Sequence, residues 1–262
     1  MNGGSVTATA DLGNLGASWH VIGSGDFNGD GFSDVLWQND NGAAAVWEMN
    51  GGTVIGGGVV GNPGPGWHAI GSGDFTGDGR SDILWQNDNG QAVIWALNGS
   101  TVVATAAAGN PGPSWHAVAT GDFNGDGKSD IVFQNDSGEG FIWAMNSATV
   151  IGAASIGNPG PSWHIRGTGD FYGNGQSDIL WQNDSGEVAV WEMNNANLVA
   201  AADLGNPGAG WQAIGTGDYN GDGRADILFQ SSAGAVDIWQ MSGPTVLAST
   251  ALGNPGQSWH AV

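Results

Sequence analysis

The sequence predicts an all-β protein in which one four-stranded unit occurs five times. Tryptophan recurs every 48 residues from Trp19 to Trp259, with no insertion or deletion between the copies. Each interval holds four short apolar runs separated by turns rich in Gly, Asn and Asp, and the runs are too short and too β-branched for helices. Neighbouring positions of the second and third runs are both apolar, which indicates sheets covered on both faces. These observations predict a β-propeller with five blades of four antiparallel strands.

The repeat at residues 67–114 illustrates the elements of one blade. WHAIGSGDF is predicted to form the first strand and to lead into an aspartate-rich loop, and DILWQ is predicted to form the second strand. The turn NDNG, whose Asn and Gly tolerate positive φ angles, joins it to a third strand in QAVIWAL. NGS then turns the chain into a fourth strand in TVVATAAAG, which NPGP ends before the next Trp.

The whole chain, residues 1–262, is predicted to be a single propeller domain. Its repeats span residues 4–51, 52–99, 100–147, 148–195 and 196–243, followed by a partial repeat at 244–262. The two ends duplicate each other, so residues 5–12 and 244–252 compete to be the outer strand of the blade formed by residues 211–242. We expect the N-terminal copy to close the ring, with a redundant C-terminal segment and a monomeric protein. An open or strand-exchanged oligomer is the alternative.

The composition limits the possible partners. The chain has 25 Asp and Glu against 4 Lys and Arg, a formal net charge of −21, which disfavours binding to nucleic acid and to anionic membranes. Fourteen Trp and 40% hydrophobic residues are enough for a folded core. With no Cys, disulfides and thiolate metal sites are excluded, and oxygen ligands remain. There is no apolar run long enough to span a membrane and no visible signal peptide.

An aspartate-rich loop, GDFNGDGFSD at residues 25–34, returns in every repeat. Counted from Asp26, oxygen-bearing side chains stand at positions one, three, five and nine, and position seven offers its carbonyl. Calcium takes six to eight oxygens at about 2.3–2.6 Å, and a tightly curled loop can aim alternate side chains at one point. Ordinary Asp-Gly turns are the alternative reading, which five copies make weak. The candidate calcium ligands are Asp26, Asn28, Asp30, Phe32 and Asp34; Asp74, Thr76, Asp78, Arg80 and Asp82; Asp122, Asn124, Asp126, Lys128 and Asp130; Asp170, Asn174, Gln176 and Asp178; and Asp218, Asn220, Asp222, Arg224 and Asp226.

The fourth loop departs from this pattern. Asn174 replaces a carboxylate at position five, and Tyr172 replaces a short polar side chain at position three. We therefore expect four or five calcium ions, with the weakest binding in blade 4. Calcium would stabilise the fold by offsetting repulsion between clustered carboxylates. Loops of this kind suit the high calcium concentration outside cells, so an extracellular, secreted protein is expected.

The loop and the strand that follows it, GDFNGDGFSDVLWQ in the first repeat, resemble the FG-GAP or VCBS repeat. The resemblance covers almost the whole chain. It implies a propeller blade like those of integrin α-subunits, of secreted bacterial proteins and of calcium-loop propeller lectins, with calcium bound between the first and second strands. This chain has fewer blades than integrin propellers have.

A Trp-His corner at the start of the first strand of each predicted blade, with Gln212 in place of His in the fifth, is a candidate ligand site. An exposed Trp can stack on the apolar face of a sugar while a neighbouring His or amide binds its hydroxyl groups. Packing between blades is the alternative role, and it is favoured for Trp in general. The turn QND-N/S-G is similarly either a plain hairpin or a glycan contact. The corner residues are Trp19, His20, Trp67, His68, Trp115, His116, Trp163, His164 and Trp211.

Four readings remain compatible with the sequence, and none of them is catalytic. Functional residues that repeat in every blade do not suggest an enzyme, because a catalytic site is normally unique in a chain. We expect a calcium-stabilised extracellular recognition propeller that binds carbohydrate at several sites. The alternatives are a structural or protein-interaction module of a larger secreted protein, a non-catalytic domain of a polysaccharide-degrading enzyme, or a symmetric, designed scaffold without a specific ligand.

Overall fold

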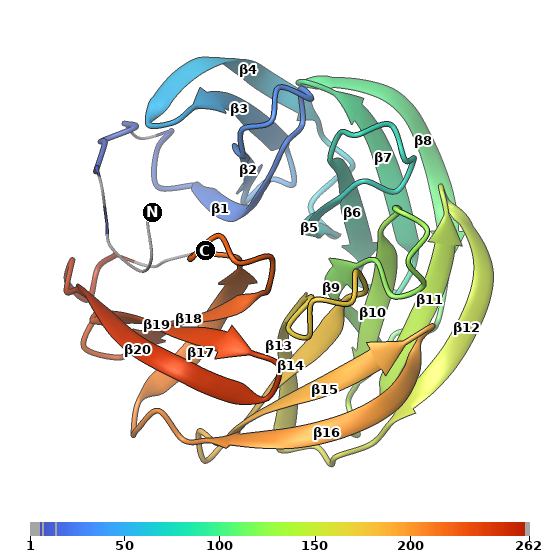
Figure 1. Cartoon of the computed structure of the whole chain (residues 1–262). Helices are drawn as coiled ribbons and strands as arrows, with labels where there is room; N and C mark the ends of the chain where they lie inside the picture. The colour runs from blue at the N-terminus through green and yellow to red at the C-terminus, as the bar shows by residue number, and fades with distance from the viewer. Residues whose placement is uncertain (1–5, 7, 14, 260–262) are drawn as a thin grey trace.

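The computed structural model describes residues 6, 8–13 and 15–259 and confirms the predicted fold class. Five four-stranded antiparallel sheets follow one another around a ring (Figure 1). Blade 1 contains β1 (Trp19–Gly25), β2 (Asp34–Asn39), β3 (Ala44–Asn50) and β4 (Thr53–Gly61); blade 2 contains β5 (Trp67–Gly73), β6 (Asp82–Asn87), β7 (Ala92–Asn98) and β8 (Thr101–Gly109); blade 3 contains β9 (Trp115–Gly121), β10 (Asp130–Asn135), β11 (Gly140–Asn146) and β12 (Thr149–Gly157); blade 4 contains β13 (Trp163–Gly169), β14 (Asp178–Asn183), β15 (Val188–Asn194) and β16 (Asn197–Gly205); blade 5 contains β17 (Trp211–Gly217), β18 (Asp226–Ser231), β19 (Val236–Ser242) and β20 (Thr245–Gly253).

Each sheet is a simple meander, as the turn sequences predict. The first strand lies at the centre of the ring and the fourth at its rim (Figure 1). In blade 2, Trp67 pairs with Asn87 and Ile83 pairs with Trp95, so the aspartate loop joins the first two strands at one end of the blade. The described residues include no helix long and apolar enough to cross a membrane.

The hydrophobic core is shared between neighbouring blades. One cluster joins Leu36 and Val46 of blade 1 to Ile83, Trp85 and Leu97 of blade 2, and all five side chains are fully buried. Equivalent clusters join blades 2 and 3, 3 and 4, and 4 and 5. Apolar residues of both parities in the middle strands are therefore needed, because each sheet packs on both faces.

Hydrogen bonds repeat the same junction along the ring. Near the centre, the hydroxyl group at one inner-strand position donates to the carbonyl of the equivalent residue in the preceding blade, as Thr120 does to Ser72 at 2.7 Å. Ser72, Thr168 and Thr216 do the same toward Ser24, Thr120 and Thr168. Blades are thus joined by a fixed set of polar contacts as well as by apolar packing.

The expected closure by the N-terminal strand is wrong. β20 provides the outer strand of blade 5, pairing with β19 from Ser242 opposite Thr245 to Val236 opposite Gly253. Of the N-terminal copy, residues 6 and 8–12 are described and form no strand, while residues 5 and 7 lie outside the described residues. The physical reason is loop closure: β20 follows β19 through a tight turn, whereas the N-terminal copy would have to pair across the ends of the chain.

The junction between blades 5 and 1 is looser than the other four. The inner strands β1, β5, β9 and β13 each contact the inner strand of the next blade. The pair β17 and β1, which would close the ring, lacks a contact as extensive as these. Val35 and Trp37 of blade 1 are half-buried, whereas their blade 2 equivalents Ile83 and Trp85 are fully buried. Among the described residues, no bond from the Ser33 amide repeats the one that joins Ser81 to Asp26 at 2.7 Å. The sheet face of blade 1 at this junction is therefore incompletely covered.

Candidate functional site

The aspartate loops form the tight curl that their sequence predicts. In blade 1, Asp26 accepts hydrogen bonds from the amides of Gly29, Asp30 and Gly31 at 2.7, 3.1 and 2.8 Å. The side chains of Asn28 and Asp30 meet, with Nδ2 of Asn28 donating to Oδ2 of Asp30 at 3.0 Å. Gly29 and Gly31 have φ angles of 79° and 86°, which favour glycine and allow the curl. Loop positions one, three and five are thus brought together.

The aspartate at position nine, which the sequence predicts to be a calcium ligand, accepts hydrogen bonds from backbone amides. Asp82 is fully buried, its Oδ1 accepts from the amide of Leu97, and its Oδ2 accepts from the amides of Phe75 and Thr76. The same residue is buried in the other four blades and accepts the corresponding amides; these residues are Asp34, Asp130, Asp178 and Asp226. It therefore fixes the aspartate loop to the third strand of its own blade.

Burial raises the pKa of four of these carboxyl groups, those of Asp82, Asp130, Asp178 and Asp226. Desolvation raises the pKa of Asp82 to about 6 against the amide hydrogen bonds that lower it, and the charge of Asp74 raises it further. Desolvation likewise raises the pKa of Asp130 and of Asp178 to about 6, with added repulsion from Asp122 and Asp170 respectively. Repulsion between the first and the ninth aspartate of a loop thus adds to the effect of burial on the pKa.

As folded, the loops do not present a complete acidic cluster. No group of three or more His, Cys, Asp or Glu side chains within the described ranges is arranged to hold a metal ion. The cause is visible in blade 1, where Asp26 and Asp34 direct their oxygens at backbone amides. Calcium at these loops remains a prediction.

The fourth loop keeps its shape without a carboxylate at position five. Asp170 accepts from the amides of Gly173, Asn174 and Gly175 at 2.6, 3.0 and 2.7 Å, as its counterparts do in the other blades. Tyr172 packs against the hydrophobic core of blades 4 and 5. At position five, Asn174 accepts from the amide of Gln176 at 2.9 Å, as aspartate does in the other loops, so the curl needs an acceptor there but no carboxylate.

The Trp-His corners and the QND turns, far apart in the sequence, meet between blades. At the first junction, Trp67 and His68 of blade 2 line a pocket of about 250 Å³ together with His20, Gln38 and Asp40 of blade 1. Equivalent pockets at the second and third junctions have volumes of about 320 and 300 Å³. The tight turn of one blade reaches the NPGP corner of the next, since a Cβ on Gly42 would collide with the carbonyl of Gly64.

Four corner tryptophans, Trp67, Trp115, Trp163 and Trp211, both pack between blades and line a pocket. Trp67 is half-buried, and part of its indole packs against the core of blades 1 and 2 while it also lines the pocket. Trp115, Trp163 and Trp211 pack in the same way at the following junctions. Among second-strand tryptophans, Trp85 and Trp181 are fully buried, as expected of core residues.

Each pocket of the first three junctions contains a His-Asp pair. Nε2 of His20 lies 2.7 Å from Oδ1 of Asp40, and the same atoms of His68 and Asp88 lie 2.8 Å apart. Both partners are exposed, at 59% and 66% of the side chain for His20 and Asp40. The pair fixes the orientation of the imidazole ring and leaves polar atoms available to a ligand.

The glutamine that opens each QND turn is not a free surface residue. It joins neighbouring blades beneath the pocket. Nε2 of Gln86 donates to the carbonyl of Trp115 at 2.8 Å, and its Oε1 accepts from the amide of Ala117 at 2.8 Å. Gln86 is only 6% exposed. The signal was present in blade 5, where the turn degrades to Gln230-Ser-Ser-Ala-Gly but the glutamine persists.

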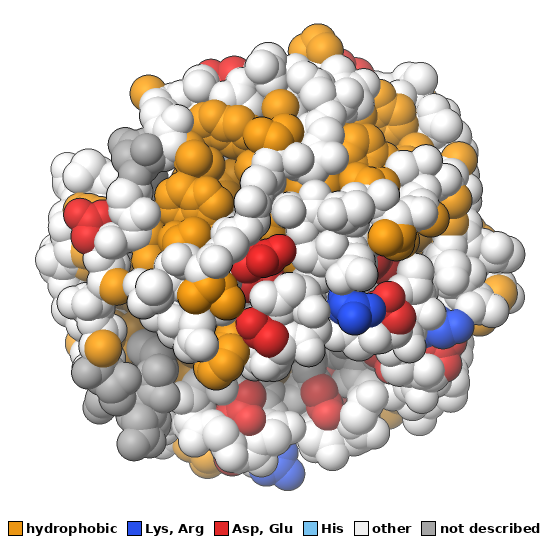
Figure 2. Space-filling view, turned by 90° about the horizontal axis from the view of Figure 1, so that it is seen from above, with side chains coloured by type: hydrophobic (Ala, Val, Ile, Leu, Met, Phe, Trp, Pro, Cys, Tyr) orange, Lys and Arg blue, Asp and Glu red, His pale blue; other side chains and the backbone are white. Residues whose placement is uncertain are grey.

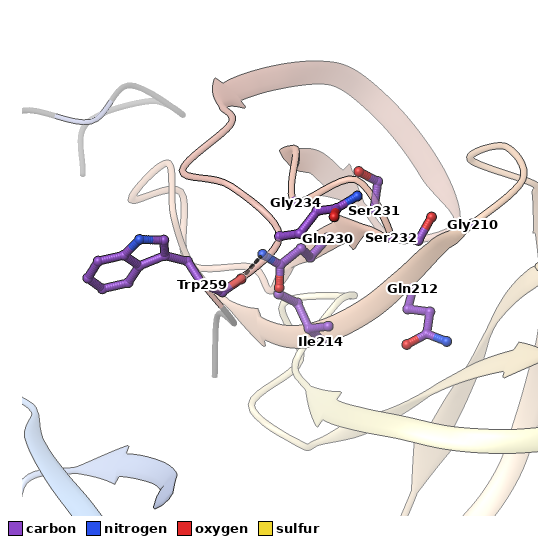
Figure 3. Close-up of a pocket in the computed structure, with 9 residues that line it drawn as sticks. Gly210, Gln212, Ile214, Gln230, Ser231, Ser232, Gly234 and Trp259 are labelled. Atoms are coloured by element: carbon purple, nitrogen blue, oxygen red, sulfur yellow. Dashed lines mark hydrogen bonds between the residues drawn. The ribbon is translucent and has the colours of Figure 1, made fainter. Parts of the chain in front are cut away.

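The last pocket is lined by two residues near the end of the partial repeat, Gln257 and Trp259. Gln230 donates to the carbonyl of Trp259 at 2.8 Å, and Figure 3 shows the indole of Trp259 pointing away from the other labelled residues. Trp259 is 64% exposed, unlike the half-buried Trp of the other corners. The segment that ends in Trp259 therefore takes the place that the first residues of a following blade take at the other junctions.

Comparisons with known proteins agree with the repeat architecture. A family model of the FG-GAP-like repeat matches residues 26–85, 74–133 and 170–229, which together are more than half of the chain. No curated protein sequence matches. Among solved structures, the Photorhabdus luminescens Tc holotoxin pore is similar with a TM-score of 0.56 and 18% identity, over 92% of this chain and 12% of that one. Chaetomium thermophilum Raptor is similar with a TM-score of 0.55 and 14% identity, over 89% of this chain and 21% of that one.

At these identities the two structures share the fold alone, and this chain spans only a small part of each. The family match rests on the aspartate loops and on the strands that flank them. The chain belongs to the FG-GAP-like repeat family, as a propeller of five repeats.

Proposed function

We propose that this propeller is a non-catalytic, calcium-stabilised extracellular recognition module that binds carbohydrate in the pockets between its blades. The observation that carries the proposal is the repeated pocket, in which a Trp wall, a His-Asp pair and polar turn residues converge from two blades. Several similar sites on one rigid ring would give high avidity for a repetitive ligand even if each site binds weakly.

The chemistry of the pocket suits a sugar. In the second pocket, the half-buried Trp115 offers part of an apolar ring face, and His68, Asp88 and Asn87 offer donors and acceptors around it. Sugars have an apolar face and a rim of hydroxyl groups, which these two kinds of surface complement. Volumes of about 250 to 320 Å³ at the first three junctions suit one or two small rings better than a large ligand.

Calcium is proposed as a structural ion at the aspartate loops. The support is the repeated loop sequence, the contact of Asn28 with Asp30, and the raised pKa of Asp82, which records unfavourable burial of charge. An ion bound by positions one, three and five would offset the repulsion between the loop carboxylates and rigidify the loop. The extracellular setting follows from the same proposal, because weak calcium loops are filled only where calcium is abundant.

A glycan array with labelled protein tests the proposal directly. Binding in excess calcium that is weakened in Trp115→Ala is the expected result, because that substitution removes one wall of one of the repeated pockets and lowers the number of sites. Val103→Ser is the matched control, since Val103 is an exposed rim residue of β8 outside the pockets. A wild-type protein that is folded, calcium-loaded and still bound to no glycan would overturn the carbohydrate proposal.

A second function, protein interaction, is favoured by the rim of the ring. The outer strands carry exposed apolar side chains, and Figure 2 looks onto the β4 side of the rim, where apolar side chains gather. These side chains include Val54, Ile55 and Val59 on β4, Val103 on β8, Ile151 on β12 and Val199 on β16. Outer strands of this kind can accept a partner strand at their free edge. If no glycan binds, the interaction module is the function that remains.

A further inference from the structure

The pocket at the fourth junction, between blades 4 and 5, differs from the other four in charge. It has a volume of about 180 Å³ and is lined by Arg166, Gln182, Asp184 and Trp211, among others. Arg166 occupies the position that Ile22, Ile70, Val118 and Ile214 occupy in the other blades. This position therefore has an aliphatic side chain in four blades and a cationic side chain in blade 4.

The guanidinium group of Arg166 has no hydrogen-bond partner among the described residues. Its Nε is buried and unpaired, although a guanidinium group can donate five hydrogen bonds. Burial lowers the pKa of Arg166, while the charge of Asp184 acts in the opposite direction. An arginine remains charged under these conditions, so the pocket contains a partly desolvated cation without a direct partner.

The neighbouring acid is already engaged. Oδ1 of Asp184 lies 2.8 Å from Nε2 of His164, as in the other His-Asp pairs. At the first three junctions the corresponding aspartate has no Arg or Lys beside it in the pocket lining, so those pockets are acidic when the histidines are neutral. In the fourth pocket, Arg166 offsets the charge of Asp184.

The placement is notable in a chain with so few cations. Only four Lys and Arg occur in the sequence, and the other three, Arg80, Lys128 and Arg224, stand at position seven of aspartate loops. There Arg80 lies 3.4 Å from Asp78, and Nζ of Lys128 donates to Oδ1 of Asn146. Arg166 instead lines the pocket at the fourth junction together with Trp211.

We propose that the fourth pocket is a subsite for a carboxylate-bearing sugar, a uronic acid. Guanidinium and carboxylate groups form paired, charge-assisted hydrogen bonds, and Trp211 would contact the apolar face of the same ring. The first three pockets, which lack the cation, take neutral sugars. This inference rests on the proposed function and assigns the substrate class of one of its sites.

The experiment is calorimetric titration of the full chain with D-galacturonate and, separately, with D-galactose. The expected result is about tenfold tighter binding of galacturonate at a single site, the size of one charge-assisted interaction. In Arg166→Ile, which restores the residue type of the other blades, this preference disappears while galactose binding at the other pockets is unchanged. Ile70→Arg, the reciprocal change at the second junction, is expected to add a second galacturonate site.

A nuclear magnetic resonance measurement makes the result independent of heat signals. The chain has three arginines, so three guanidinium Nε–H resonances are expected, and Arg166→Ile identifies one of them. Galacturonate should shift that resonance and leave those of Arg80 and Arg224 in place. Sodium acetate is the comparison ligand: an equal shift at equal concentration would mean that the pocket recognises carboxylate without the sugar, which would overturn the uronic-acid assignment.

The failures of the two proposals are distinguishable. Galactose binding without a galacturonate preference would overturn the Arg166 inference and leave the carbohydrate function standing. Binding of neither sugar would overturn both proposals. A preference that survives in Arg166→Ile would place the acidic site elsewhere and would also overturn the inference.

Discussion

Oδ1 of Asp82 accepts a hydrogen bond from the amide of Leu97 at 3.1 Å, between the adjacent strands β6 and β7 of the second blade. The same carboxylate accepts from the amides of Phe75 and Thr76 at the start of the aspartate loop. One buried side chain therefore holds the loop to the third strand, and it does so in all five blades. The position has a structural role whether or not calcium binds beside it.

Removing this carboxylate should destabilise the protein. In Asp82→Ala the buried amides of Leu97 and Phe75 and the half-buried amide of Thr76 lose their acceptor. Each unsatisfied buried amide costs about 1–3 kcal/mol, so a loss of at least ~2 kcal/mol of unfolding free energy is expected. Asp82→Asn retains one acceptor oxygen and should lose less. Urea titration in the presence of a chelator measures both variants. Asp78→Ala, at an exposed loop position, is the control and should change the unfolding free energy by less than ~1 kcal/mol.

The metal-free protein should lose stability as the pH rises from about 4 to about 7. Burial raises the pKa of Asp82, Asp130 and Asp178 to about 6, above the ordinary value of 3.8, so the folded state binds protons more tightly than the unfolded state. The stabilising contribution of their protonation is complete below the unfolded pKa and is lost as the pH passes through about 6. Urea midpoints at several pH values in chelator test this slope. A midpoint that rises steadily over the same interval would contradict it.

Calcium should raise the melting temperature, and the fourth loop should contribute least. Its position five is Asn174, whereas every other loop has aspartate there. Asn174→Asp is expected to increase the number of ions bound or the affinity of the weakest site, because it restores a third carboxylate to the loop. Calorimetric titration with calcium chloride counts the sites. Asp126→Asn, which removes the carboxylate at position five of the third loop, should weaken or remove one site. Identical melting curves with calcium and with chelator would rule out the structural ion.

Equivalent tryptophans should differ in their contribution to stability. Trp85 is fully buried at the junction of blades 1 and 2, and Trp85→Ala should cost about 3–5 kcal/mol of unfolding free energy. Trp37 has the same position in blade 1 but is half-buried at the loose junction with blade 5, so Trp37→Ala should cost clearly less, roughly 1–3 kcal/mol. Chemical denaturation of the two variants gives the comparison. Equal losses would indicate that blades 5 and 1 pack as tightly in solution as the other blades do.

The strands and turns of one blade could be predicted from the amino-acid sequence alone. Turn residues such as Gly42 and Gly90, the loop glycines and the paired apolar positions act over a few residues, and their repetition every 48 residues fixed the number of strands and sheets. It also located both candidate sites, the aspartate loop and the Trp-His corner, because each is a short contiguous motif.

How these motifs combine depends on the packing of neighbouring blades and could not be predicted from local sequence. Trp67 and Asp40 face one pocket because adjacent sheets pack with a fixed offset, which no local pattern specifies. The choice between the two terminal copies depended on loop closure, and that favoured β20. The same packing buries the aspartate at position nine of each loop and places Arg166 at the edge of a pocket. The roles of these residues therefore depend on how neighbouring blades cover them.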